Sequence, residues 1–321
     1  MRVLITGAGG FIGSQLTRLA LRQGVEVTAL LRPGSDPWRI ADVLPSLRVV
    51  QGDLLHPEPA WLKELETAHP EICLHFAWIA EPGVFLNSPL NQDYLAASLR
   101  LAEQLANVGC RKLVVAGSFS EYDQELGYLS ETSALKPNTP YGAAKVALYQ
   151  ALSQWLPSSK MELVWPRIFS VYGPREHVKR FVPAVTLSAL RGEPTRLSPG
   201  EQQRDYLHVG DVASAVWHVT QAGLTGPVNI GSGKPVPIAE IARLIGELTG
   251  RPDLIRLGDL PYRPGDPMLV AANTARLQST GWLPRYHLPS GLRHTVQWWK
   301  EYLKERSQVG TSKDSPAQRE L

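Results

Sequence analysis

Short apolar runs alternate with amphipathic stretches through the first half of the chain, and this alternation constrains the fold most strongly. The apolar runs read as buried strands at residues 3–6, 25–31, 47–51, 72–77, 113–117 and 163–169. The amphipathic stretches have helical spacing at residues 11–22, 59–68, 89–108 and 140–156. Strands that alternate with helices build right-handed βαβ units. We therefore predict an α/β fold with a doubly wound parallel sheet.

The pattern becomes less regular after about residue 170, where proline and glycine are more frequent. Helical spacing continues near residues 181–191, 210–222, 237–249 and 290–304. This change predicts a second, smaller region built onto the sheet. The last stretch, residues 305–321, is polar without apolar periodicity, which predicts a disordered tail.

Composition excludes several classes of protein. The formal net charge of +3 over 321 residues, without a run of basic residues, argues against nucleic-acid binding. No apolar run is long enough to span a membrane, and the N-terminus lacks the features of a signal peptide, so we expect a cytoplasmic protein. Cys73 and Cys110 form neither a disulfide framework nor a CxxC metal motif, and we expect no metal.

A glycine-rich turn follows the first predicted strand directly. Gly7, Gly10 and Gly13 are spaced GxxGxxG, with Phe11 and Ile12 opening the next helix. Glycines allow a tight turn in which backbone N–H groups approach a pyrophosphate at the helix N-terminus, whereas a purely structural turn is the competing interpretation. The position between a strand and a helix favours a dinucleotide site in a Rossmann-type sheet.

The residues after the second and third predicted strands bear on the choice of cofactor. NAD-selective sites usually place a carboxylate after the second strand, but this chain has Arg32 there. A guanidinium can pair with the 2′-phosphate of NADP, so NADP(H) is favoured over NAD(H); a solvated strand end is the alternative. Asp53, followed by Leu54, is placed to bind adenine or to form a turn.

The segment TPYGAAKV carries two residues with acid–base potential. Tyr141 and Lys145 share one helical face at spacing i, i+4, and Thr139 and Pro140 suit the N-cap and first position of this helix. A nearby ammonium favours the phenolate, so we expect Lys145 to lower the pKa of Tyr141. A chance pair on a surface helix is the alternative.

Together these features resemble the extended short-chain dehydrogenase/reductases, which include sugar-nucleotide epimerases, dehydratases and reductases. The resemblance runs from residue 1 to about 304. Besides the glycine turn and the Tyr141/Lys145 pair, the matching motifs are HFA at 75–77, GSFSEY at 117–122, PRIFSVYGPR at 166–175, QQRDYLHVGDVA at 202–213 and YRPGD at 262–266.

The resemblance implies a catalytic trio for hydride transfer to or from a sugar carbon, most often C4 of the hexose. Tyr141 would move the proton of the substrate oxygen, and Ser118 would bind that oxygen. Lys145 would bind the nicotinamide ribose, and Phe76 and Ala77 would line the cofactor site. The cofactor domain would cover residues 1–169 with a return segment at about 205–231.

The resemblance also implies a nucleotide-sugar substrate bound by the region 170–304. Arg204 and Arg263 match arginines that clamp the substrate diphosphate, and Arg180 could add a phosphate contact; a surface salt bridge is the alternative for each. Ser120 and Ser170 fall at substrate positions, where Ser170 replaces a common asparagine. Helices 89–108 and 140–156 would pair in a homodimer.

Other positions depart from the family and narrow the function. Dehydratases carry consecutive Asp-Glu after the catalytic Ser/Thr, where this chain has Phe119 and Ser120, so dehydration is not expected. Glu121 is one residue further on and, on a strand-like segment, would face the opposite way. Tyr94 stands where asparagine is usual, and the sequence offers no account of it.

Three functions follow from these departures. We favour an NADPH-dependent reductase of a 4-keto(-6-deoxy) sugar nucleotide, because Arg32 stands where NAD-dependent enzymes carry a carboxylate. An NAD-dependent 4-epimerase is the alternative. A dinucleotide-binding regulator without catalysis is disfavoured, because Ser118, Tyr141 and Lys145 are all present.

Overall fold

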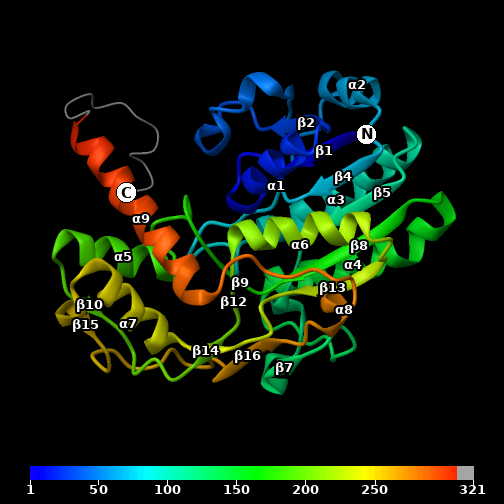
Figure 1. Ribbon diagram of the computed structural model, residues 1–321. Coiled ribbons are helices and arrows are strands. Elements are labelled where there is room, and N and C mark those ends of the chain that lie inside the picture. The colour runs from blue at the N-terminus through cyan, green and yellow to red at the C-terminus, as the bar shows by residue number, and fades with distance from the viewer. Residues whose placement is uncertain (309–321) are drawn as a thin grey trace.

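The computed structural model describes residues 1–308 and is built around one parallel sheet (Figure 1). The strand order is β13-β8-β5-β4-β1-β2-β3, with β6 also paired to β8. The strands are β1 Arg2–Thr6, β2 Glu26–Leu31, β3 Arg48–Gln51, β4 Ile72–His75, β5 Lys112–Val115, β6 Gly117–Ser118, β8 Glu162–Ile168 and β13 Gly226–Ile230. The predicted doubly wound parallel sheet is confirmed, and β13 is a strand that the sequence pattern did not reveal.

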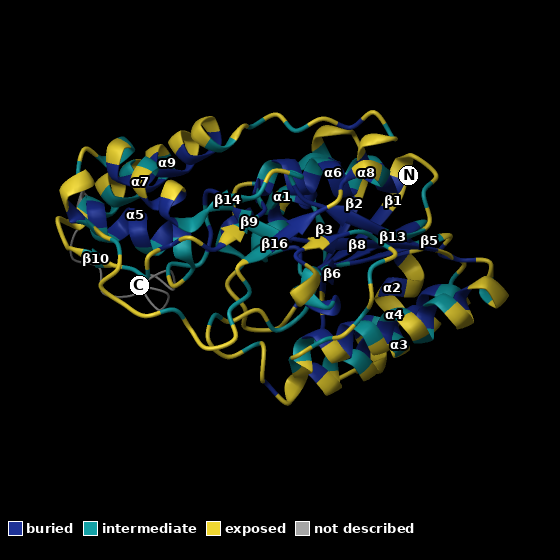
Figure 2. Ribbon diagram, turned by 90° about the horizontal axis from the view of Figure 1, so that it is seen from below, coloured by how far each residue is buried: buried dark blue, intermediate teal, exposed yellow. Residues whose placement is uncertain are grey.

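Helices cover both faces of this sheet (Figure 2). One face carries α1 (Phe11–Arg22) and α6 (Val209–Gln221), and the other carries α2 (Pro59–Ala68), α3 (Leu90–Asn107) and α4 (Pro140–Ser159). The helices predicted in the first half therefore form, within a few residues of the expected bounds.

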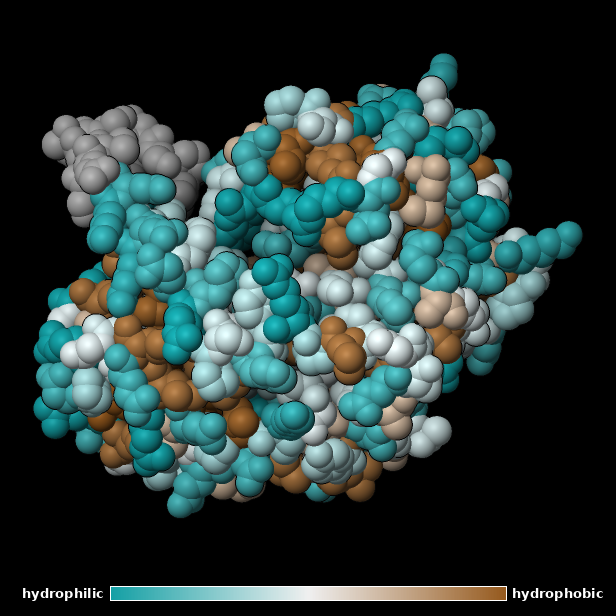
Figure 3. Space-filling model, in the orientation of Figure 1, coloured by the Kyte–Doolittle hydropathy of each residue, from teal (hydrophilic) through white to brown (hydrophobic). Residues whose placement is uncertain are grey.

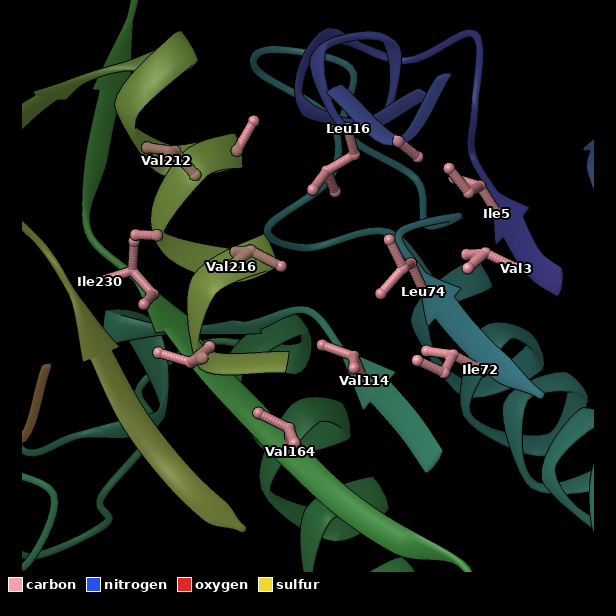
Figure 4. Close-up of a cluster of buried hydrophobic side chains, with 14 of the residues drawn as sticks. Val3, Ile5, Leu16, Ile72, Leu74, Val114, Val164, Val212, Val216 and Ile230 are labelled. Carbon is pink, nitrogen blue, oxygen red and sulfur yellow. The ribbon is translucent and has the colours of Figure 1, made fainter. Parts of the chain in front are cut away.

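Alternation along the strands divides the core into two layers. In β1, Val3 and Ile5 pack toward α1 and α6, whereas Leu4 packs toward the other face. Figure 4 shows the first layer, in which Leu16 of α1 and Val216 of α6 lie over the strands. All five side chains are fully buried.

A second lobe lies beside the carboxyl ends of the strands. Its helices are α5 Phe181–Arg191, α7 Ile238–Thr249 and α9 Leu288–Gln308, whereas the short helix α8 Ala275–Gln278 packs against β13 of the large sheet. Its short strands are β7 Tyr128–Leu129, β9 Ser170–Tyr172, β10 Thr195–Arg196, β11 Gln203–Arg204, β12 Tyr206–His208, β14 Val236–Pro237, β15 Ile255–Arg256 and β16 Leu269–Ala272.

Short 3-10 turns occur in the loops of both parts of the molecule. They are η1 Trp38–Ile40, η2 Leu44–Ser46, η3 Phe119–Glu121, η4 Gln124–Leu126 and η5 Pro252–Leu254.

The end of the chain corrects one expectation. Residues 305–308, expected in a disordered tail, belong to α9, and the rest of the predicted tail lies outside the described residues. In residues 1–308, no helix combines the length and apolarity needed to cross a membrane. The face in Figure 3 is mostly hydrophilic, with apolar side chains in small patches.

Candidate active site

The glycine turn adopts the close-packed geometry expected of a phosphate cradle. Gly7 has φ +71°, and a Cβ there would lie 2.7 Å from the backbone nitrogen of Ala77. A Cβ on Gly13 would clash with the carbonyl oxygen of Gly7. Gly10 caps α1 without any side-chain hydrogen bond, so no side chain occupies the N–H groups of the first turn. The cradle therefore fits a dinucleotide pyrophosphate.

The HFA motif fixes the strand that faces this cradle. His75 Nδ1 lies 2.7 Å from Thr6 Oγ1, and its Nε2 lies 2.8 Å from Ser98 Oγ. Burial, with a smaller effect of Lys145, lowers the pKa of His75 to about 3, so the ring stays neutral. The motif thus joins β1, β4 and α3, and leaves Phe76 and Ala77 partly exposed beside the glycine turn.

The predicted adenosine side lies at the ends of β2 and β3. Arg32 is exposed directly after β2. Asp53 is held in a turn, because its Oδ1 accepts the N–H of Leu55 at 2.9 Å, and Leu54 is buried. Both charges act on Tyr94: burial raises its pKa, Asp53 adds to this rise, and Arg32 opposes it. Arg32 and Asp53 are therefore close enough for their charges to act on the Tyr94 hydroxyl.

Ser118 lies at the carboxyl end of the sheet and is held by a capping box. Its Oγ accepts the N–H of Ser120 at 3.1 Å, and its own N–H donates to Glu121 Oε1 at 2.7 Å. The segment expected to be strand-like is in fact the 3-10 turn η3, so the predicted conformation around Glu121 is wrong. Glu121 is fully buried and paired with Arg167, whose Nε lies 2.7 Å from Oε2.

The start of α4 brings Tyr141 against Ser118. Thr139 caps the helix as predicted, accepting the N–H of Gly142 at 3.2 Å. A Cβ on Gly142 would clash with the carbonyl oxygen of Ser120, so the helix start packs directly on η3. The two hydroxyls lie close enough for Ser118 to act on the pKa of Tyr141.

The expected lowering of the Tyr141 pKa is not found. Burial of the hydroxyl raises this pKa to about 12, and Glu121 raises it further, while the bond to Ser118 and the charge of Arg180 oppose the rise. Lys145 is buried instead, with its pKa lowered to about 7 by desolvation, against a smaller opposing effect of Glu121.

The sequence interpretation missed an aromatic cluster that covers Lys145. Its ammonium lies 3.5 Å from the ring centroid of Trp78, which stacks on Tyr94 at 5.4 Å and meets Tyr141 edge-on at 6.4 Å. Phe85 also meets Tyr141 edge-on, at 5.0 Å. The cluster explains Tyr94, which supports Trp78. The aromatic residue directly after HFA was the available signal.

The predicted substrate arginines line the second lobe. Arg204 pairs with Asp266, whose Oδ1 lies 2.5 Å from the arginine Nη2. Arg263 is exposed on the same loop, three residues before Asp266. Arg180 lies over Phe85 at 5.0 Å and donates to the carbonyl oxygen of Ala80 at 3.1 Å. Arg180 therefore lies against Phe85, which itself contacts the ring of Tyr141.

The remaining substrate positions lie at the ends of the strands. Ser120 is buried in η3, and Ser170 is half-buried at the start of β9, with its N–H donating to the carbonyl oxygen of Asp205. Phe119 packs against Phe169 at 5.7 Å between ring centroids, so it fills space and offers no proton. In residues 1–308, no group of three His, Cys, Asp or Glu could hold a metal ion.

Comparison with known proteins agrees with this geometry. The model of the NAD dependent epimerase/dehydratase family matches residues 3–231. A dTDP-glucose 4,6-dehydratase of Mycolicibacterium smegmatis is 30% identical over 94% of this chain and 93% of its own length. A UDP-glucose 4-epimerase of Halalkalibacterium halodurans is 26% identical over 94% and 96%.

Solved structures show the same similarity. The UDP-glucose 4-epimerase of Thermus thermophilus, solved as a complex with NAD, superposes with a TM-score of 0.82 at 28% identity, covering 94% of this chain and 99% of that chain. Because the family model spans the glycine turn, the Ser118/Tyr141/Lys145 group and the return segment, the chain belongs to the NAD-dependent epimerase/dehydratase family, within the extended short-chain dehydrogenase/reductases.

Proposed function

We propose that the protein is an oxidoreductase that reduces a 4-keto(-6-deoxy) sugar nucleotide with NADPH. The observation that carries this proposal is that the packing of the start of α4 on η3 groups Tyr141 with Ser118 and the buried Lys145, at the strand ends that face the glycine cradle. The relatives named above act on dTDP-glucose or UDP-glucose, which supports a nucleotide-activated sugar as the substrate class.

Each residue of this group has a distinct task. Tyr141, with a pKa of about 12, holds its proton at neutral pH and is therefore suited to donate it to a keto oxygen. The hydroxyl proton of Ser118 orients the same oxygen, because Ser118 Oγ is already an acceptor for Ser120. Bound nicotinamide supplies the hydride. Lys145 would hold its ribose once Trp78 no longer covers the ammonium.

The same turn argues against dehydration. Phe119 packs against Phe169, and the Glu121 carboxylate accepts hydrogen bonds from Ser118, Trp165 and Arg167. Neither residue is available to remove water from a sugar. The proposal is therefore hydride transfer without elimination, although a dehydratase is among the relatives.

Cofactor choice separates the reductase from a second candidate. Arg32 is exposed after β2, where it can reach a 2′-phosphate, and this supports NADPH and one-way reduction. The solved epimerase complex contains NAD and supports 4-epimerisation with a retained cofactor instead.

The test is a cofactor titration followed by a substrate assay. Cofactor-stripped protein is titrated with NADPH and NADH, alongside Arg32→Asp and the control Arg100→Asp, which changes an exposed arginine on α3. We expect a preference for NADPH that only Arg32→Asp abolishes, and NADPH oxidation by 4-keto-6-deoxy sugar nucleotides. Tight NAD with interconversion of UDP-hexoses identifies the epimerase.

A mutant pair tests the chemistry in either case. Tyr141→Phe should reduce turnover by roughly 10²–10⁴-fold, the usual contribution of general acid–base catalysis. Tyr149→Phe lies two turns along the same helix, against Trp165, and serves as the matched control. Near-normal turnover in Tyr141→Phe excludes the assignment. Bound cofactor without turnover on any sugar nucleotide favours a non-catalytic regulator.

A further inference from the structure

A buried carboxylate lies directly behind the Ser118/Tyr141/Lys145 group. Glu121 is fully buried, and both of its oxygens accept hydrogen bonds. Oε1 accepts the N–H of Ser118 at 2.7 Å, and Oε2 accepts Arg167 Nε at 2.7 Å. The indole N–H of Trp165 lies 3.0 Å from Oε1 and 3.1 Å from Oε2.

We propose that Glu121 is a positioning residue of the hydride-transfer site: its carboxylate fixes Ser118 through the backbone and supplies a negative charge behind Tyr141 and Lys145. The proposal rests on the proposed function in that Ser118, Tyr141 and Lys145 carry the chemistry.

The first half of the role is geometric. Because Glu121 holds the Ser118 N–H and Ser120 N–H holds the Ser118 Oγ, the serine is fixed at two atoms. The neighbouring residue is adapted to this arrangement, since a Cβ on Gly117 would clash with Trp165 Nε1 and lie 2.7 Å from Glu121 Oε1. Such a fixed serine can direct its remaining proton to one point in the site.

The second half is electrostatic. The charge of Glu121 favours protonated Tyr141 and protonated Lys145, because it raises the pKa of each. Arg167 on β8 is paired with Glu121 at 2.7 Å, and its positive charge opposes the field of the carboxylate. Arg180 opposes Glu121 at Tyr141.

The other groups nearby contribute less. His75 on β4 faces Lys145 and stays neutral, and Tyr122, beside Arg167, has its pKa raised by burial. Removing the Glu121 charge should therefore move the titration of Lys145 toward lower pH.

The experiment measures NADPH and NADH affinity from about pH 5.5 to 9 by fluorescence, and therefore needs no sugar substrate. In the plot of cofactor affinity against pH, a step that disappears in Lys145→Met reports the titration of Lys145. We call this step the Lys145 limb. Glu121→Gln removes the charge, whereas Glu121→Asp keeps the charge and shortens the side chain. Trp165→Phe removes one buried partner of the carboxylate and is the matched control.

We expect Glu121→Gln to shift the Lys145 limb to lower pH, and Glu121→Asp and Trp165→Phe to leave it in place. With a substrate that the enzyme converts, both Glu121 variants should show a kcat lower by about 10-fold or more and little change in the KM for the cofactor. Misplacement of a reacting group has this effect. Trp165→Phe should keep kcat.

Two results overturn the proposal: an unmoved Lys145 limb in Glu121→Gln, or wild-type kcat in both Glu121 variants. If Glu121→Gln fails to fold, kcat of Glu121→Asp decides, because a wild-type kcat in that variant overturns the positioning role. A wild-type protein that binds neither cofactor refutes the proposed function instead, so the two failures are distinguishable.

Discussion

Lys145 should make the folded protein less stable than a neutral residue would. Its side chain is 2% exposed, and its ammonium lies over the ring of Trp78 at 3.5 Å. Desolvation lowers its pKa from 10.5 to about 7. A lysine with its pKa lowered by burial opposes folding wherever the unfolded chain is charged.

The size of the effect follows from the shift. A change of about 3.5 units, at about 1.4 kcal/mol per unit, corresponds to about 5 kcal/mol of destabilisation below pH 7, where both states are charged. The contact with Trp78 offsets about 2 kcal/mol of this. Lys145→Met should therefore raise the free energy of unfolding by about 3 kcal/mol at pH 6.

The pH dependence gives the sign a second test. Between about pH 7 and 10.5 the unfolded chain holds a proton that folded Lys145 has released, so wild-type stability from this group rises with pH. The advantage of Lys145→Met should be largest below pH 7 and absent near pH 10.5.

Urea unfolding of both proteins at about pH 6, 8 and 10 measures this difference, with Lys63→Met, an exposed lysine on α2, as control. A destabilised Lys145→Met at pH 6, or a difference that does not change with pH, refutes the reasoning. Lys145→Met should also bind the cofactor more weakly. The lysine would then lower the stability of the fold while serving the function of the site.

Two further predictions concern α3 and α4. Thr139→Ala removes the side chain that accepts the Gly142 N–H, and should lower the free energy of unfolding by about 1 kcal/mol, measured by urea titration. Unchanged stability would mean that water replaces the cap. If α3 and α4 pair across a two-fold axis, sedimentation at micromolar concentration should show a dimer. Trp155→Glu, which puts a charge at an exposed position of α4, should disrupt that dimer. A wild-type monomer would exclude this pairing.

Local sequence patterns predicted the sheet and its helices well. The apolar runs of parallel strands and the turns between them each depend on a few consecutive residues. Thr139 at the N-cap and Pro140 at the first position mark the start of α4 in the local sequence. The glycine spacing at 7–13 likewise predicted a tight turn, and in the structure the backbone at Gly7 lies too close to Ala77 for a side chain to fit.

Long-range pairings were not readable in the same way. β13 pairs with β8, which lies far earlier in the chain, and its register depends on the path of the second lobe. The conformation around Glu121 was mispredicted, because the two-residue strand β6 turns into η3. The pairing of its carboxylate with Arg167, 46 residues away, was not readable from the local sequence. The pKa of Tyr141 depends on burial, which the i, i+4 spacing with Lys145 does not report.

The aromatic cluster shows how these non-local contacts change the chemistry of a familiar motif. Lys145 at its motif position was expected to act on Tyr141, yet its ammonium lies against Trp78, and burial dominates both pKa values. Nicotinamide binding must replace that contact if Lys145 is to hold the ribose. The ring of Trp78 then has to move, and Tyr94, on whose pKa the charge of Arg32 acts, is stacked on that ring. Trp78 therefore links Lys145 to Tyr94 of α3 through direct contacts, so a change at the ammonium is passed to both rings.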